Sequence, residues 1–189
     1  MSAEIRSYED TVQNNQNKSV LSLYEWVEAA VFSLLCVTLI FTFIFRIVGV
    51  DGDSMNPTLY NSERLIITRM FYTPKHGDIV IINRYLQEPL VKRVIAVGGD
   101  ELEINDETHQ VIINGKALNE PYIKGNTESY GFKPNKQKIP EGTVFVMGDN
   151  RENSKDSRWM EEVGFVKVND IMGKAVFRFF PINRAGGLY

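Results

Sequence analysis

The sequence predicts a mainly β protein in which one N-terminal transmembrane helix is followed by an all-β domain of short antiparallel strands, arranged as a barrel or a sandwich. Two observations indicate this class. An uncharged apolar run occupies residues 29–45, and its apolar flanks bring it to roughly the 20 residues that a spanning helix needs. Residues 49–189 have the size of one domain, and they contain short segments rich in β-branched and aromatic residues between Gly, Pro, Asn and Asp.

The predicted membrane helix covers residues 25–48 and follows a polar tail, residues 1–24. Its centre reads AAVFSLLCVTLIFTFIF, and the charges of Glu28 and Arg46 can reach the interface from its two ends. A buried core helix would carry a polar face, and a cleaved export signal would begin with a basic segment near the N-terminus. Neither feature is present, so we expect an uncleaved anchor in the lipid bilayer.

The charge balance excludes several classes of partner. The chain carries 21 Lys and Arg against 24 Asp and Glu, a net charge of −3, so it has no basic surplus for nucleic acid. It has no glycine-rich phosphate loop, and two histidines with one cysteine do not make a zinc-binding pattern. We therefore expect no cofactor and no metal.

Basic residues flank the apolar run about equally, so charge alone leaves the orientation of the helix open.

Seven segments of the domain have strand character. In chain order they are 64–69, 78–85, 90–97, 110–118, 143–149, 164–168 and 174–180. Asn114-Gly115 predicts a tight hairpin turn inside the fourth segment. Residues 119–140 have little periodicity and predict a long loop or lid with at most one short strand. Only the stretch after Asp156 is compatible with a short helix.

The histidines argue against a Ser-His-Asp hydrolase. His76 lies in the turn TPKHGD and His109 in the loop DETHQ, so we expect both to be solvated loop residues. If the chain is an enzyme, its general base is therefore not histidine.

Ser54 and Lys92 are the alternative pair. Ser54 follows a Gly-Asp turn in VDGDSMNPTL, where a serine is most often a turn residue. In a strand over 90–97, alternation gives one face to Leu90, Lys92, Val94 and Ala96. Both faces are apolar apart from one cation each, so the strand is expected to be buried. Burial lowers the pKa of a lysine, as a general base requires, although a lysine at a sheet edge would give the same pattern.

A third segment, VFVMGDNRENSKDSR at 144–158, ends a strand in a dense polar cluster. Such a cluster is commonly a solvated loop, but it also suits a hydrogen-bonded network behind a catalytic site. In that case Ser154 is a candidate to orient the lysine amine, and Asp156 with Arg158 is a candidate ion pair that holds the loop.

Together these segments resemble the bacterial type I signal peptidases. The resemblance rests on five motifs in order: GDSMNPTL, HGDIVII, VKRVIAVGGD, VFVMGDNRENSKDSR and GFVKVNDIMGKAVFRFFP. It implies a membrane-bound serine endopeptidase with a Ser-Lys dyad that removes signal peptides from exported preproteins by cutting after small residues (Ala-X-Ala). The single anchor and the small domain are similar to the Gram-positive form. The resemblance also implies a cytoplasmic N-terminus and an extracytoplasmic catalytic domain.

Carried over residue by residue, the resemblance makes Ser54 the nucleophile and Lys92 the general base. Ser154 corresponds to the serine that positions the lysine, and Asp156 and Arg158 to the structural pair. The Gram-negative pattern has a serine two residues before the nucleophile, where this chain has Gly52. We therefore expect the backbone N–H of Ser54 to be one oxyanion donor and leave the second donor open.

The substrate is expected to bind as an extended strand beside Val50–Gly52 and Leu90–Lys92. Met55, Leu90 and Val91 are the predicted pocket-lining residues. The apolar run Met70–Tyr72 is either a core contact or a segment that dips into the lipid surface.

Two other functions remain open at this stage. One is a self-cleaving repressor-type Ser-Lys enzyme, which the membrane anchor and the absence of a DNA-binding helix pair disfavour. The other is a non-catalytic, membrane-tethered β domain that serves as a binding or assembly module. In that module, Ser54 and Lys92 would be ordinary turn and strand residues.

Overall fold

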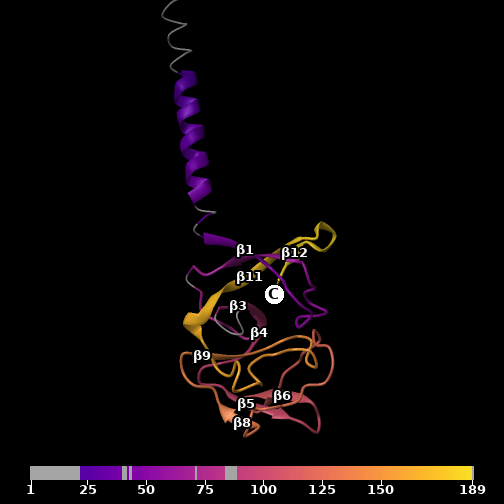
Figure 1. The fold of residues 1–189 in the computed structure, drawn as a ribbon. Helices are drawn as coiled ribbons and strands as arrows, with labels where there is room; N and C mark the ends of the chain where they lie inside the picture. Colours follow the sequence, from indigo (N-terminus) through magenta and orange to yellow (C-terminus); the bar gives the residue numbers. More distant parts are fainter. Residues whose placement is uncertain (1–21, 40–41, 43, 71, 84–88, 189) are drawn as a thin grey trace, which may run out of the picture. The chain divides into compact units, whose positions relative to one another are not determined.

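The computed structural model describes residues 22–39, 42, 44–70, 72–83 and 89–188, which fall into two compact units, Met1–Phe43 and Ile44–Tyr189 (Figure 1). The first unit contains the helix Ser22–Leu39, which is long and apolar enough to cross a membrane. Nearly all of the predicted tail, residues 1–24, lies outside the described residues. The predicted helical range 25–48 is wrong at its end, because a strand begins at Phe45.

The second unit is built on two antiparallel sheets, and the predicted mainly β class is confirmed. The larger sheet has the order β1-β2-β11-β3-β4-β9-β10, with β12 paired to β11. Its strands are β1 (Phe45–Gly49), β2 (Arg64–Thr68), β3 (Ile79–Ile82), β4 (Leu90–Val97), β9 (Thr143–Met147), β10 (Val166–Lys167), β11 (Ile171–Phe180) and β12 (Gly186–Gly187).

The smaller sheet has the order β7-β6-β5-β8 and consists of β5 (Glu101–Asn105), β6 (Gln110–Ile113), β7 (Lys116–Ala117) and β8 (Lys136–Lys138). Its strands β5, β6 and β8 lie at the end of the unit opposite to β1 and β12 (Figure 1). The hairpin between β6 and β7 turns at Asn114 and Gly115, whose φ angles of 52° and 76° suit the predicted tight turn.

Several boundaries differ from the sequence prediction. Strands β1 and β5 were not among the predicted segments, and β11 begins at Ile171, three residues before the predicted start. The stretch after Asp156 forms turns, and the described helices of the domain are two short 3₁₀ turns, Val168–Asp170 and Ile182–Arg184. β8 is the one short strand predicted within residues 119–140.

Strand β4 is buried, as predicted, but its alternation is broken. Val94 pairs with Val146 on β9, whereas the next paired residue is Ala96, opposite Phe145. This bulge leaves Ile95 as an extra residue, so Ile95 and Ala96 both join the same hydrophobic cluster. The face shared by Leu90, Lys92 and Val94 therefore ends at Val94, and the prediction that Ala96 continues it is wrong.

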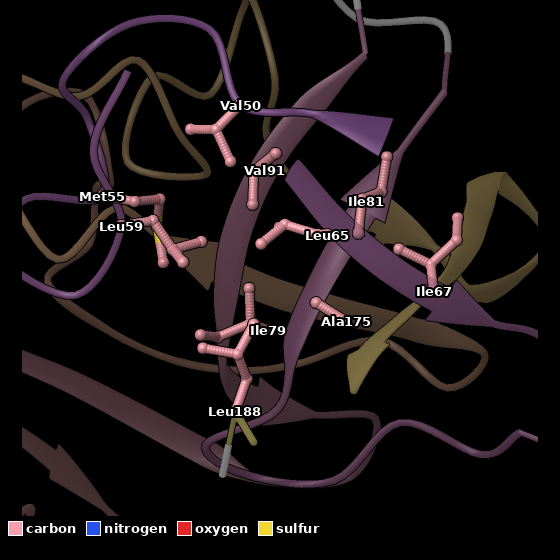
Figure 2. Packing of buried hydrophobic residues seen from close by; sticks show 10 residues of the cluster. All are labelled: Val50, Met55, Leu59, Leu65, Ile67, Ile79, Ile81, Val91, Ala175 and Leu188. Atoms are coloured by element: carbon pink, nitrogen blue, oxygen red, sulfur yellow. The ribbon is translucent and has the colours of Figure 1, made fainter. Parts of the chain in front are cut away.

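Three hydrophobic clusters fill the unit. The first receives side chains from the ends of β1 and β12, from β2, β3, β4 and β11, and from the segment between β1 and β2 (Figure 2). Met55 and Leu59 belong to that segment and are 1% and 0% exposed. The segment that carries Ser54 is therefore anchored in the core at two points.

The C-terminal residues pack against the same segment. Arg178 on β11 donates to the carbonyl oxygen of Thr58 at 2.9 Å, and Arg184 contacts the same oxygen at 3.4 Å. Both guanidinium groups pair with Glu63, which is 2% exposed. Leu188 is buried in the first cluster, so the segment directly after β12 is part of the core.

Met70 is 47% exposed, and Phe71 lies outside the described residues. Tyr72 is half-buried against the third cluster, and its hydroxyl donates to Asp78 at 2.8 Å. Tyr72 therefore has the core contact, which is one of the two alternatives, and the lipid contact of the exposed Met70 stays a prediction.

Candidate active site

Ser54 lies in a compact turn between β1 and β2. Gly52 begins it with φ of 82°, a conformation that residues with a side chain rarely adopt, and its N–H donates to Asn61 Oδ1 at 3.1 Å. The N–H of Asn56 donates back to the carbonyl oxygen of Asp53 at 3.2 Å. With Met55 buried next to it, the serine is held on a fixed backbone.

Lys92 reaches this turn from the middle of β4. Its Nζ donates to Ser54 Oγ at 2.7 Å, and the residue is 3% exposed. Its cross-strand partner is Val80, and Val80 and Val94 belong to the third hydrophobic cluster. The structure thus brings the two predicted dyad residues into hydrogen-bond contact in apolar surroundings.

Burial lowers the pKa of Lys92 to about 8. Desolvation of the ammonium is the main cause. Asp156 and Asp149 act in the opposite direction, and Arg158 lowers the pKa further. A substantial fraction of the amine is therefore neutral near pH 8, and a neutral amine can accept a proton.

The loop after β9 contains the predicted ion pair. Arg158 donates to Asp156 from Nε at 2.8 Å and from Nη2 at 2.9 Å, and both residues are 0% exposed. Asp156 also accepts from the N–H of Gly148 at 3.0 Å. The pair thus ties the end of the loop back to its beginning, directly behind the dyad.

Ser154 lies near the turn that carries Ser54, but it makes no hydrogen bond to Lys92. Its Oγ is buried and has no hydrogen-bond partner in the described part of the chain. A Cβ on Gly148 would lie 2.3 Å from Ser154 Oγ and 2.4 Å from the carbonyl oxygen of Ser54. Ser154 is therefore close to the site, and its orienting role stays a prediction.

Sequence reasoning missed a second buried ion pair. Arg93, the residue after Lys92, donates to Asp149 from Nε at 2.8 Å and from Nη2 at 2.6 Å. Its guanidinium also lies 4.0 Å from the ring centre of Tyr122. The sequence did contain a signal for this ion pair. Arg93 is the second cation of a strand that is buried on both faces, and a buried cation needs a carboxylate partner that is also buried.

Asn150 was also missed. Its backbone N–H donates to the carbonyl oxygen of Ser54 at 3.0 Å, and its Nδ2 donates to that of Asp53, also at 3.0 Å. Asn150 is 6% exposed. It was one of several polar residues in the cluster, and nothing in the sequence distinguished it.

The histidines have other partners. His76 Nε2 lies 2.7 Å from Asp100 Oδ2, and His109 contacts the carbonyl oxygen of Thr127 at 3.4 Å. Among the described residues, no group of three or more His, Cys, Asp and Glu is arranged to hold a metal ion.

Comparison with known proteins decides the family. The profile of the family described as "Signal peptidase, peptidase S26" matches residues 23–180. The chain belongs to the signal peptidase family, peptidase S26.

Its relatives share both sequence and length. A signal peptidase I of Bacillus licheniformis is 39% identical, over 92% of this chain and 96% of the relative. Signal peptidase I P of Bacillus subtilis subsp. natto is 36% identical over 90% and 96%, and signal peptidase I S of Bacillus subtilis (strain 168) is 38% identical over 86% and 91%.

In this member of the signal peptidase family, the segment predicted as a loop or lid is tied down beside the site. The N–H of Lys124 donates to the carbonyl oxygen of Asp149 at 2.7 Å, and the N–H of Arg151 donates to that of Lys124 at 2.8 Å. The buried guanidinium of Arg151 also bonds Glu120 and Thr127. Residues 120–127 therefore act as a strap over the loop after β9.

The predicted pocket residues of this signal peptidase family member are largely covered. Met55 and Val91 are 1% and 7% exposed and belong to the first cluster, while Leu90 is half-buried against the third. Their contact with substrate stays a prediction, and Met55 and Val91 offer a substrate only a small surface.

Proposed function

We propose that the chain is a membrane-anchored signal peptidase I that removes signal peptides from exported preproteins, with Ser54 as nucleophile and Lys92 as general base. The observation that carries the proposal is the 2.7 Å hydrogen bond between Lys92 Nζ and Ser54 Oγ at a lysine that is 3% exposed. Membership of the peptidase family and the lowered pKa of Lys92 support it.

In the first step, neutral Lys92 takes the hydroxyl proton of Ser54 as Oγ bonds to the scissile carbonyl carbon. The carbonyl oxygen becomes an oxyanion. Lys92 then gives the proton to the leaving amine as the C–N bond breaks, which leaves the signal peptide as an ester on Ser54. In the second step Lys92 takes a proton from water, which attacks the ester, and the proton returns to Ser54 as the peptide acid leaves.

The oxyanion is stabilised by the backbone N–H of Ser54 and by a second donor on the side of Gly52. Gly52 is exposed, and a Cβ built on it meets nothing within 4 Å. The space beside Gly52 is therefore open to the substrate carbonyl and to a water molecule as the second donor.

Three residues support the dyad. Asp156 and Arg158 fix the loop after β9, and the Asp156 carboxylate stabilises the charged form of Lys92 between the two proton transfers. Ser154 orients the Lys92 amine when substrate closes the site, since its buried Oγ has no other hydrogen-bond partner among the described residues.

The substrate binds extended along backbone edges that no described strand covers. β3 pairs with β4 from Leu90 onward, whereas β9 pairs with β4 only from Arg93 onward, which leaves Leu90–Lys92 free on that side. β1 is the outer strand of the sheet and leads to Val50–Gly52. Small residues before the cleaved bond, as in Ala-X-Ala, are preferred because Met55 and Val91, 1% and 7% exposed, offer little apolar surface to a larger side chain.

The helix Ser22–Leu39 anchors the enzyme in the lipid bilayer as a single span. The N-terminal tail is cytoplasmic and the β domain is extracytoplasmic, because the domain must meet signal peptides on the far side of the membrane.

The test is cleavage of a purified preprotein with an Ala-X-Ala site in detergent micelles. Intact protein is compared with Ser54→Ala and Lys92→Ala, and with Lys116→Ala, an exposed lysine on β7, as control. We expect cleavage after the second Ala by the intact and control proteins only. If folded intact protein cleaves no preprotein, or if both dyad variants stay fully active, the protease assignment falls and the binding-module function replaces it.

A further inference from the structure

Asn150 holds both peptide groups that flank the nucleophile. Its backbone N–H bonds the carbonyl oxygen of Ser54, and its side-chain amide bonds that of Asp53, each at 3.0 Å. Together with the bond from Lys92 to Oγ, hydrogen bonds from distant residues reach the side chain of Ser54, its own carbonyl oxygen and the carbonyl oxygen of Asp53.

The hydrogen bond from the Asn150 side chain to the carbonyl oxygen of Asp53 affects the direction of the proposed oxyanion donor, the N–H of Ser54. The peptide between Asp53 and Ser54 is trans, so its C=O and N–H point in opposite directions. A donor that holds the carbonyl of Asp53 therefore fixes the direction of the Ser54 N–H. The other bond to this carbonyl oxygen comes from the N–H of Asn56 within the same turn, at 3.2 Å. Within the described part of the chain, the side chain of Asn150 is thus the hydrogen-bond donor that ties this peptide to a distant segment of the domain.

Asn150 is itself well supported. Its neighbours Asp149 and Arg151 are both 0% exposed, and both are bonded through their backbones to Lys124 of the strap. Gly148 lies so close to the carbonyl of Ser54 that it has no room for a Cβ. The amide of Asn150 is therefore delivered from a rigid backbone, as preorganisation of an oxyanion donor requires.

We infer that Asn150 is a positioning residue whose side-chain amide orients the Ser54 N–H toward the substrate oxyanion. The inference rests on the proposed function, because it assumes that Ser54 is the nucleophile. Asn150 touches no reacting atom, and it acts through the Asp53–Ser54 peptide.

The test uses full-length protein in micelles with Asn150→Ala, which removes the side-chain bond without adding charge. The control is Asn153→Ala, the same change at an exposed position of the same loop. We expect kcat to fall by about five- to tenfold, the size of one lost neutral hydrogen bond, with KM within about twofold of the intact enzyme. The midpoint of the pH–kcat/KM profile stays in place, because the surroundings of Lys92 are unchanged.

A loosened fold would instead move KM or the pH midpoint. If Asn150→Ala does not fold, Asn150→Asp is tested in its place. The aspartate has the shape of the asparagine side chain, but it presents an oxygen, which cannot donate a hydrogen bond, to the carbonyl oxygen of Asp53. It should lose more kcat than the alanine variant. A fall in kcat of less than about threefold in the folded variant, or a loss carried by KM, overturns the role of Asn150. If Ser54→Ala also stays active in the same assay, the proposed function has failed instead.

Discussion

Replacing Lys92 with Met should make the protein more stable as it removes the proposed general base. Met is similar in length and is apolar, so it suits the position among Val80, Leu90 and Val94. A pKa lowered from 10.5 to about 8 corresponds to about 3 kcal/mol by which the charged amine destabilises the folded state. This cost is present at pH 7, where folded Lys92 is still mostly protonated.

The stability of the intact protein depends on pH because Lys92 has a lower pKa in the folded chain than in the unfolded chain. Between pH 8 and 10.5 the unfolded chain binds more protons at Lys92 than the folded chain, so the stability of the intact protein rises with pH. Below pH 8 the full cost applies. The stability advantage of Lys92→Met should therefore shrink by about 2 kcal/mol between pH 8 and pH 10.

The assay is urea unfolding of both full-length proteins in micelles at pH 7, 8, 9 and 10, followed by tryptophan fluorescence. Trp159 reports on the domain because it stacks on Tyr130 with ring centres 5.2 Å apart. Lys116→Met, at an exposed position of β7, is the matched control and should show no pH-dependent difference. A stability difference between Lys92→Met and the intact protein that is constant from pH 8 to 10 would refute the reasoning.

Three further predictions concern the surroundings of the dyad. First, kcat/KM should rise about tenfold between pH 7 and 9 and then level off, because the neutral fraction of an amine with a pKa of about 8 grows from about 9% to about 91%; a rise that continues beyond pH 10 would mean that Lys92 is not the titrating group. Second, Asp149→Asn leaves the guanidinium of Arg93 buried without its charge partner, so urea unfolding should show a loss of about 3 kcal/mol, against no more than about 0.5 kcal/mol for Asp51→Asn at an exposed position. Third, Gly148→Ala places a methyl group 2.4 Å from the carbonyl oxygen of Ser54, and the resulting displacement should lower kcat by about 100-fold, while Gly49→Ala, with nothing within 4 Å, keeps it; equal activities of the two variants would contradict the packing described for the site.

The strands that the sequence predicts best are those whose burial pattern is local. β4 matches its predicted range because a short segment that is apolar on both faces, apart from one cation on each, is typical of a buried strand. β1 was missed because its apolar residues follow the membrane run with only Arg46 between them, so hydropathy alone cannot separate strand from helix at Phe45. The bulge at Ile95 depends on how β9 pairs with β4, and one strand's sequence does not contain that information.

The residues of the candidate site also fall into those that local motifs predict and those that only the tertiary fold brings together. Ser54, Lys92, Asp156 and Arg158 stand in recognisable motifs, and the structure brings Ser54 to Lys92 and Asp156 to Arg158. The contacts of Asn150 with Asp53 and Ser54 join residues about 100 positions apart. Such contacts depend on the tertiary fold, so no local pattern could indicate them.

The packing of the chain's end against the segment after Ser54 bears on when the enzyme becomes competent. Thr58 and Glu63 receive Arg178 and Arg184, and Leu188 completes the first cluster. Arg178 lies 120 residues after Thr58 in the chain, so the turn that carries Ser54 has all of these partners only after β11 and the residues that follow it have been synthesised and have packed. A nascent or truncated chain therefore lacks an assembled serine site. Assembly of the Ser54 turn is thus coupled to the folding of β11 and of the residues up to Leu188.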